Sequence, residues 1–375
     1  MASVRKRMLD SGLECWICDY FDQHGKRHQK AFPSRKLAVA WKDTAMHEVM
    51  QGTHSTGNDT VADAAGAWIS FVRNEDLERS TIAMYEQHVR DHIVPRIGHR
   101  KLKDLTRPRI VAFRDELVGA MSRALAKKVL GTFKSIVKDA ATRGSVATDN
   151  AAGVQIEMSG RKPKLEVGRD IPTKAEIQKI VDHAAAARGR VLLLTAALTG
   201  MRASELRGLR WSDVDLANRQ ISVRQRADRY RKIGQPKSAA GTRTIPIGDM
   251  VANTLREWRL QCPKGLLDLV FPTGAGTIEN HANIVNRILW PAQTAAGVVD
   301  DDGKPKYGMH ALRHFYASWC INRKADGGLE LPPKTVQARL GHASIVMTLD
   351  RYGHLFPTND DGAELAAAER SIFAT

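Results

Sequence analysis

Alternating apolar and polar positions mark the start of the chain as β-structure. Residues 13–21 alternate in this way, and residues 27–32 continue after a turn at 23–26 that contains Gly25. Because glycine adopts positive φ without steric cost, this arrangement predicts a hairpin. Apolar residues at helical spacing follow from Leu37 to Val49, with Ser34 as the expected N-cap. This part of the chain therefore predicts a small sheet with one helix.

Helical periodicity then runs through residues 59–145 and predicts four helices. Their apolar stripes are Ala64, Trp68, Phe71 and Val72; Met84, Val89 and Ile93; Ile110, Phe113 and Leu117; and Leu125, Val129, Phe133, Ile136 and Val137. Ser80 is the expected N-cap of the second helix, which Pro95 and Gly98 are expected to end. Basic residues lie on other faces of the fourth helix: Lys127, Lys128 and Lys134.

Two polar stretches, residues 52–58 and 159–164, read as linkers between these regions and the rest of the chain. After the second linker, Thr173 is the expected cap of a helix, and residues 188–200 predict another. Residues 220–224 and 243–247 are expected to pair as a basic hairpin. The chain contains no internal repeat or low-complexity tract, and we expect domains at 1–56, 59–155 and 170–375.

Composition narrows the class of protein. The 375 residues are 43% hydrophobic and 26% charged, which excludes a disordered chain and suits two or three domains. No apolar run approaches the length of a membrane span, and four cysteines are too few for a disulfide framework, so we expect a protein of a reducing cytoplasm. A net charge of +16 favours a polyanionic partner, most often nucleic acid. A merely soluble basic protein is the alternative.

Two groups of residues imitate metal sites. Cys15 and Cys18 precede His24 and His28, but the spacing is too short for a zinc finger, and strand positions three apart point to opposite faces. His310 and His314 have the spacing of a zinc-binding helix but lack the glutamate of that motif. We therefore expect no metal at either place.

A third group of residues makes chemical sense as one site. Arg202 follows Gly200, which is expected to break an apolar helix, and His310 and Arg313 share a helical face. His342 and Tyr352 follow. Guanidinium groups bind phosphate oxygens and can neutralise a phosphodiester whose charge grows in the transition state. A tyrosine hydroxyl becomes a covalent nucleophile once a base, such as a histidine, takes its proton.

These motifs resemble the catalytic domain of the tyrosine recombinase (phage integrase) family. The matches are Thr-Gly-x-Arg-x-x-Glu-Leu at 199–206, His-x-Leu-Arg-His at 310–314, Leu-Gly-His at 340–342, and the tyrosine that follows. Residues 59–155 resemble the family's helical core-binding domain, and 1–56 its arm-binding domain. The resemblance covers nearly the whole chain and implies a multidomain fold, mainly α with small β elements.

The resemblance also implies a role for each residue of the site. Tyr352 would attack the scissile phosphate to give a 3′-phosphotyrosyl link, and Arg202 and Arg313 would bind the non-bridging oxygens. His342 would donate a hydrogen bond to the phosphate, and His310 would help to accept the tyrosine proton. Because the phosphotyrosine conserves the bond energy, neither ATP nor a metal cofactor is expected.

Other residues of the chain are candidates for supporting roles in the site. By the same resemblance Lys237 would protonate the leaving 5′-oxygen, although Lys232 lies on the same hairpin, and Glu205 would support the site. His314 is read as a core histidine. Basic residues of the hairpin are candidate phosphate contacts or a solvated basic face: Arg224, Arg226, Arg229 and Arg231.

The expected function is integration or excision of a mobile element, such as a prophage, by four protomers on double-stranded attachment sites. Residues 362–373 predict a helix that docks on a neighbouring protomer or on its own domain. An excisionase and a host DNA-bending protein are common partners in the family, and a bacterial nucleoid is the expected location. The alternatives are a type IB topoisomerase-like activity and a catalytically silent DNA-binding relative.

Overall fold

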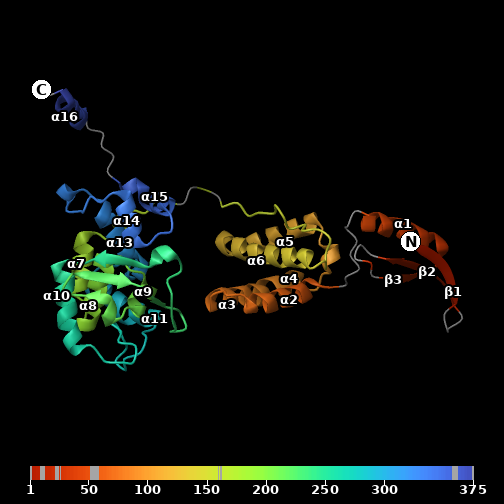
Figure 1. Ribbon diagram of the computed structural model, residues 1–375, viewed down its shortest axis with the longest axis horizontal. Coiled ribbons are helices and arrows are strands. Elements are labelled where there is room, and N and C mark those ends of the chain that lie inside the picture. The colour runs from red at the N-terminus through yellow and green to blue at the C-terminus, as the bar shows by residue number, and fades with distance from the viewer. Residues whose placement is uncertain are drawn as a thin grey trace. The chain divides into compact units, whose positions relative to one another are not determined.

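A computed structural model describes residues 2–8, 13–21, 25, 27–50, 59–158, 160, 163–356 and 362–373. The chain forms two compact units, Met1–Arg161 and Lys162–Thr375 (Figure 1). Each has its own cluster of buried apolar side chains. Within the described ranges, no helix is both long and apolar enough to cross a bilayer.

The first unit begins with an antiparallel sheet in the order β1 (Ser3–Met8), β2 (Glu14–Phe21) and β3 (Arg27–Phe32), followed by α1 (Arg35–Met50). Helix α1 covers one face of the sheet, and Trp41 meets Tyr20 with their ring centroids 5.1 Å apart (Figure 1). The predicted hairpin and helix are confirmed, with Ser34 capping the Leu37 amide. Turn residues 23, 24 and 26 and the linker 52–58 lie outside the described residues.

The same unit continues as a helical module. Its elements are α2 (Val61–Asn74), α3 (Arg79–His88), a π-turn (Val89–Ile93), α4 (Val94–Ile97), a 3-10 turn (Leu102–Asp104), α5 (Arg107–Ala120) and α6 (Arg123–Thr142). Phe113 and Phe133 meet in its core with ring centroids 5.0 Å apart. The four predicted helices are present, the second being α3 and α4 joined through the π-turn.

Two details of that second helix were predicted wrongly. The helix begins two residues earlier, with Glu78 as its N-cap, so Ser80 lies inside it. Pro95 does not end the helix, because the wide π-turn before it makes room for the proline ring. The side chain of Arg96 donates to the carbonyl of His92 at 3.1 Å and so satisfies part of the disturbed ladder. The helix ends at Gly98, as predicted.

The second unit carries most of the motifs. Its helices are α7 (Lys174–Asp182), α8 (Ala187–Thr199), α9 (Ala203–Gly208), α10 (Asp249–Gln261), α11 (His281–Ile284), α12 (Trp290–Ala295), α13 (Met309–Ile321), α14 (Pro333–Leu340), α15 (Ile345–Tyr352) and α16 (Gly362–Phe373). A π-turn (Val285–Leu289) joins α11 to α12, and 3-10 turns span Trp211–Asp213, Ala239–Gly241, Lys324–Asp326 and Gly353–Leu355. Its strands form two sheets, β4 (Val214–Asp215), β5 (Gln220–Val223) and β8 (Arg243–Pro246) in one, and β6 (Arg226–Ala227) and β7 (Ile233–Gly234) in the other.

Local sequence signals in this unit are confirmed. Thr173 caps α7 in a capping box with Glu176, and the predicted hairpin pairs Ile221 with Ile245. Of the second predicted linker, residues 159, 161 and 162 lie outside the described residues. Gly200 ends α8 with a φ of 62°, so the predicted break is confirmed.

Replacing Gly200 by alanine is expected to destabilise the second unit by about 2–5 kcal/mol. A Cβ there would lie 2.4 Å from Cδ1 of Tyr316, and a non-glycine residue at this positive φ is itself strained. Calorimetric unfolding of the full chain would measure the loss. The matched control is Gly66→Ala, inside α2, where a Cβ meets nothing within 4 Å and a gain of about 0.5–1 kcal/mol is expected. Equal stability of Gly200→Ala and the wild type would contradict the packing described at α8.

Candidate active site

Backbone carbonyls at two helix ends orient the two arginines. Arg313, on α13, is 2% exposed and donates to the carbonyl of Gly200 at 2.7 Å and to that of Leu340 at 2.5 Å. Arg202 is the N-cap of α9 and donates to the carbonyl of Gly341 at 3.2 Å. Burial and the nearby Arg202 lower the pKa of Arg313 to about 9, so its guanidinium stays charged at neutral pH. The two cations therefore lie beside each other at the ends of α8 and α14.

A buried carboxylate binds these cations to the hairpin. Glu205 is 2% exposed and accepts from Arg202 at 2.7 Å and from Arg243, on β8, at 2.8 Å. Burial alone would raise the pKa of Glu205, but the hydrogen bonds and charge of Arg243, together with Arg202, hold it below the ordinary value. Arg243 also donates to the carbonyl of Arg339 at 2.7 Å. Sequence reasoning missed Arg243, for which the only signal is a basic residue at the start of a predicted strand.

Tyr352 ends α15 and lies between two histidines. Its ring stacks on His342, with centroids 6.3 Å apart and planes 5° apart, and its hydroxyl lies 2.7 Å from Nδ1 of His314. Tyr352 is 1% exposed, and burial raises its pKa to about 12 despite the guanidinium groups of Arg313 and Arg351. The hydroxyl is therefore protonated in the free protein.

The histidines of the site are neutral at physiological pH. Burial, together with Arg313 and Arg202, lowers the pKa of His342 to about 4, and its Nδ1 lies 2.9 Å from the hydroxyl of Thr348. His310 is exposed on α13, where partial desolvation and then Arg313 and Arg202 lower its pKa. A neutral imidazole can donate one hydrogen bond and accept another, so each ring can hold or receive a proton.

The two lysines considered for the leaving group are both exposed on the hairpin. Lys232 lies in the turn between β6 and β7, whereas Lys237 follows β7 and precedes the 3-10 turn Ala239–Gly241. The carbonyl of Ala240 lies 2.8 Å from the position that a Cβ on Gly341 would take. The chain beside Lys237 therefore packs against the residue before His342.

The basic residues of the hairpin also lie at the surface. Arg224, Arg229 and Arg231 are exposed, while Arg226 is half-buried and donates to the carbonyl of Gln235 at 3.0 Å. Arg224 lies 3.6 Å from Asp213, and the guanidinium of Arg229 lies 5.1 Å from the ring centroid of Tyr230. Their contacts with DNA remain a prediction.

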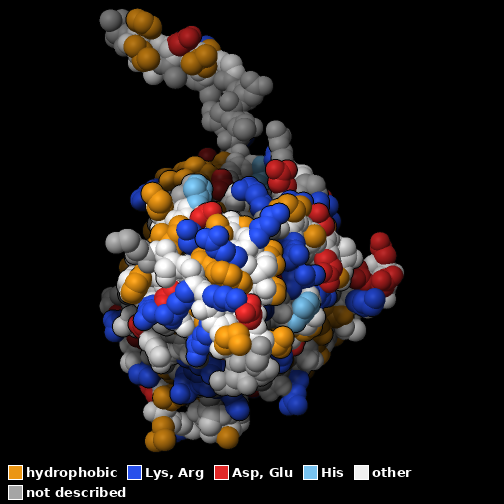
Figure 2. Space-filling model, turned by 90° about the vertical axis from the view of Figure 1, so that its right-hand side faces the viewer, with side chains coloured by type: hydrophobic (Ala, Val, Ile, Leu, Met, Phe, Trp, Pro, Cys, Tyr) orange, Lys and Arg blue, Asp and Glu red, His pale blue; other side chains and the backbone are white. Residues whose placement is uncertain are grey.

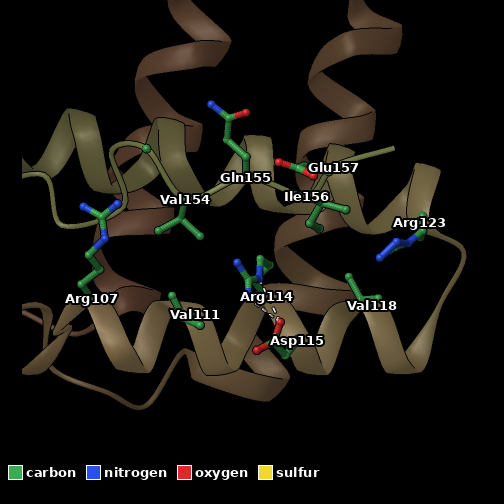
Figure 3. Close-up of a pocket in the computed structure, with 11 residues that line it drawn as sticks. Arg107, Val111, Arg114, Asp115, Val118, Arg123, Val154, Gln155, Ile156 and Glu157 are labelled. Atoms are coloured by element: carbon green, nitrogen blue, oxygen red, sulfur yellow. Dashed lines mark hydrogen bonds and ion pairs between the residues drawn. The ribbon is translucent and has the colours of Figure 1, made fainter. Parts of the chain in front are cut away.

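The helical module has basic side chains and an open cavity of about 620 Å³. Lys127 and Lys128 are exposed on α6, and Lys134 donates to the carbonyl of Val154 at 3.1 Å. Figure 3 shows the cavity between α5 and the segment that follows α6, with Arg107 and Arg123 at its two ends. It holds none of the motif residues, so we do not assign it to the chemistry.

Three of the four residues of the Cys15, Cys18, His24 and His28 group are described by the structure, and His24 lies outside the described residues. Cys15 and Cys18 are both buried in β2, opposite Arg7 and Val4 of β1 respectively. In the part of the chain that the structure describes, no three His, Cys, Asp or Glu side chains gather in a way that could hold a metal ion.

Comparison with known proteins identifies this arrangement. Residues 172–359 match the phage integrase family and residues 61–156 match the phage integrase central domain. The chain belongs to the phage integrase family. It is a tyrosine-type site-specific DNA recombinase, with the mainly helical multidomain fold of that family.

Relatives of this phage integrase family member match over most of its length. It is 26% identical to the tyrosine recombinase XerC-like protein of Caldanaerobacter subterraneus subsp. tengcongensis, covering 91% of this chain and 92% of that protein. The Tn1549 transposon integrase in complex with a circular intermediate DNA gives a TM-score of 0.65 at 18% identity, covering 84% of this chain and 99% of that one. A lambda integrase dimer bound to a core site gives a TM-score of 0.62 at 18% identity, and the match covers 96% of this chain and 97% of that one.

Proposed function

We propose that Tyr352 is the nucleophile that cleaves DNA and that Arg202, Arg313 and His342 bind the scissile phosphate. The Oη–phosphorus bond forms as the bond to the 5′-oxygen breaks, and the reverse reaction with another 5′-hydroxyl joins new strands. Tyr352 lies near both arginines and His342, although these residues come from separate segments of the chain. This observation carries the proposal. Glu205 supports Arg202 in this role.

The arginines suit a phosphate because each has more N–H donors than the carbonyls use. Two adjacent positive charges stabilise the additional negative charge of a pentacoordinate phosphorus. If the Thr348 hydroxyl donates to Nδ1 of His342, the proton of that imidazole lies on Nε2, from which it can be donated to a phosphate oxygen.

Covalent trapping tests the proposal. A pool of nicked duplexes of randomised sequence loses the 5′-hydroxyl needed for rejoining and so accumulates the protein–DNA intermediate. We expect an adduct that survives denaturation and maps to Tyr352 by mass spectrometry, together with enrichment of sequences that belong to the attachment site. Binding without any adduct at Tyr352 would overturn the assignment.

Lys237 is the proposed acid that protonates the leaving 5′-oxygen, supported by its position next to the turn that packs against Gly341. Lys237→Ala is expected to lower the cleavage rate by about 10²-fold or more, since the leaving alkoxide loses its proton donor. The defect is expected to disappear on a substrate with sulfur in place of the 5′-oxygen, because a thiolate leaves without protonation.

Lys232→Ala is the matched control for this experiment, since it removes the same charge from the same hairpin. It is expected to cleave both substrates at nearly the wild-type rate. Rescue by sulfur in Lys232→Ala rather than in Lys237→Ala would transfer the acid role to Lys232.

The proposed partner is double-stranded DNA at attachment sites, consistent with a net charge of +16. Lys and Arg outnumber Asp and Glu over the face seen in Figure 2. In the sheet, the carboxylate of Asp19 holds the guanidinium of Arg27 and the amide of Gln29 on the face away from α1. These donors, with those of the hairpin and of Lys127 and Lys128, are the proposed DNA contacts, and residues 1–56 the proposed arm-binding domain.

The proposed assembly on DNA is a homotetramer, in which α16 docks on a neighbouring protomer. Leu365, Ile372 and Phe373 on this helix are exposed, and Figure 2 shows hydrophobic side chains gathered there. Solved relatives include a lambda integrase tetramer bound to a Holliday junction. An excisionase and a host DNA-bending protein are the partners proposed to set the direction of the reaction, at the nucleoid of a bacterial host, where the enzyme would move a prophage or another integrative element.

A further inference from the structure

His314 makes the direct contact with the proposed nucleophile. Its Nδ1 lies 2.7 Å from the Tyr352 hydroxyl, and the two rings meet edge to face with centroids 5.7 Å apart. His314 is 6% exposed and Tyr352 1% exposed, so water is kept from the pair. Sequence reasoning placed His314 in the core and so missed its partner, although the i,i+4 spacing from His310 puts both histidines on one face of α13.

The other two histidines make different contacts. His342 stacks on the Tyr352 ring while its Nδ1 lies 2.9 Å from the hydroxyl of Thr348. His310 lies edge-on to His314, with ring centroids 4.6 Å apart, and among the described residues its ring nitrogens make no hydrogen bond to Tyr352. A proton leaving the Tyr352 hydroxyl therefore meets His314 first.

In the free protein the Tyr352 hydroxyl carries its proton and the His314 imidazole has room for one, so the protonation states permit transfer in that direction. Burial, followed by the charges of His310, Arg351 and Arg313, lowers the pKa of His314 to about 3, and Asp170 opposes this only weakly. The imidazole is therefore neutral. When its proton is on Nε2, its Nδ1 can accept a hydrogen bond from the Tyr352 hydroxyl. A bound phosphate would bring negative charge beside the guanidinium groups of Arg313 and Arg351 and so raise the affinity of His314 for a proton.

We infer that His314 is the catalytic base of the cleavage step. As Oη attacks phosphorus, the Oη–H bond breaks, an Nδ1–H bond forms, and the bond from phosphorus to the 5′-oxygen breaks as that oxygen is protonated by the acid of the site. On rejoining, the imidazolium returns its proton to Oη. This inference rests on the proposed function of Tyr352 and replaces His310 as the acceptor of the tyrosine proton.

The test combines His314→Asn with ring-fluorinated tyrosines at position 352. The Oδ1 of asparagine can take the place of Nδ1 and accept the hydroxyl hydrogen bond, but it cannot take a proton near neutral pH. With ordinary tyrosine, single-turnover cleavage of the nicked substrate is expected to fall by about 10²-fold or more. Each added fluorine makes the phenol more acidic, so the defect of His314→Asn is expected to shrink stepwise.

His310→Asn is the matched control on the same face of α13. Its defect is expected to stay constant across the fluorinated series, since His310 does not hold the reacting hydroxyl. A His314→Asn enzyme that cleaves as fast as the wild type or faster would overturn the inference. The hydrogen bond would then only hold Tyr352 in its resting position. A defect that does not change with fluorination would also overturn it.

A measurement on the wild-type chain tests the inference even if the His314→Asn variant does not fold. Nitrogen-15 NMR of labelled histidine is expected to show His314 as the neutral tautomer with its proton on Nε2, and the other tautomer would contradict the inference. Failure of the proposed function has a different signature, because the wild-type enzyme itself would then form no adduct at Tyr352.

Discussion

Tyr352→Phe is expected to bind DNA with the affinity of the wild type and to form no covalent adduct. Phenylalanine preserves the ring that stacks on His342 but lacks the oxygen that attacks phosphorus. Because Nδ1 of His314 is left without its buried partner, a loss of about 1–3 kcal/mol in the free energy of unfolding is also expected. Fluorescence anisotropy at a stated salt concentration measures the binding, and denaturing gels of the nicked substrate measure the adduct.

Tyr85→Phe is a suitable control, since the Tyr85 ring packs on Trp68 in the helical module with centroids 5.0 Å apart. It is expected to form the adduct at the wild-type rate. An adduct that persists in Tyr352→Phe would mean that another residue is the nucleophile. Loss of DNA binding in the same variant would mean that the hydroxyl has a role in recognition as well.

Glu205→Gln is expected to have the largest effect on stability, about 3–5 kcal/mol. In the part of the chain that the structure describes, Glu205 is the carboxylate that pairs with Arg243, whose side chain is 6% exposed. The substitution removes this negative charge and leaves the guanidinium buried. It also loosens Arg202, so cleavage is expected to slow. Calorimetry of the full chain measures the first effect and single-turnover cleavage the second.

The difference in the free energy of unfolding between Glu205→Gln and the wild type is expected to depend on pH. The folded-state pKa of Glu205 lies below its ordinary value of 4.5, so its contribution is fully present above that value and is lost as the pH falls through the folded pKa. The gap between Glu205→Gln and the wild type should therefore narrow in acid. Asp302→Asn is the control, because its ion pair with Lys304 is exposed and a change within about 0.5 kcal/mol is expected. A gap that is constant down to strong acid would contradict the linkage.

Local signals in the sequence were sufficient for most elements of the fold. A cap such as Thr173 and a break such as Gly200 act through neighbouring backbone, which is why they could be predicted from spacing alone. The second helix of the helical module shows the limit of such rules. Pro95 is tolerated there because a π-turn and the side chain of Arg96 compensate for it, and neither is visible in a periodic pattern.

Within the candidate site, motif spacing predicted that Arg202, Arg313, His342 and Tyr352 act together, and the fold brings these four residues close together. The partners of these residues could not be predicted, because they depend on contacts between segments far apart in the chain. Arg243 reaches Glu205 across 38 positions, and Tyr352 reaches a histidine equally far away. A histidine on an apolar helix face is usually a packed core residue, and only the tertiary structure shows which hydroxyl it contacts.

The helix-end carbonyls that hold the arginines have a thermodynamic consequence. Gly200 and Gly341 both have positive φ, and the carbonyls of Gly200, Leu340 and Gly341 fix the planes of the two guanidinium groups in the free protein. Long side chains that are already ordered lose little rotamer entropy when a ligand arrives. The arginine side chains therefore lose most of their rotamer entropy during folding and not when phosphate binds. As a result, more of the electrostatic attraction between the arginines and the phosphate stabilises the transition state.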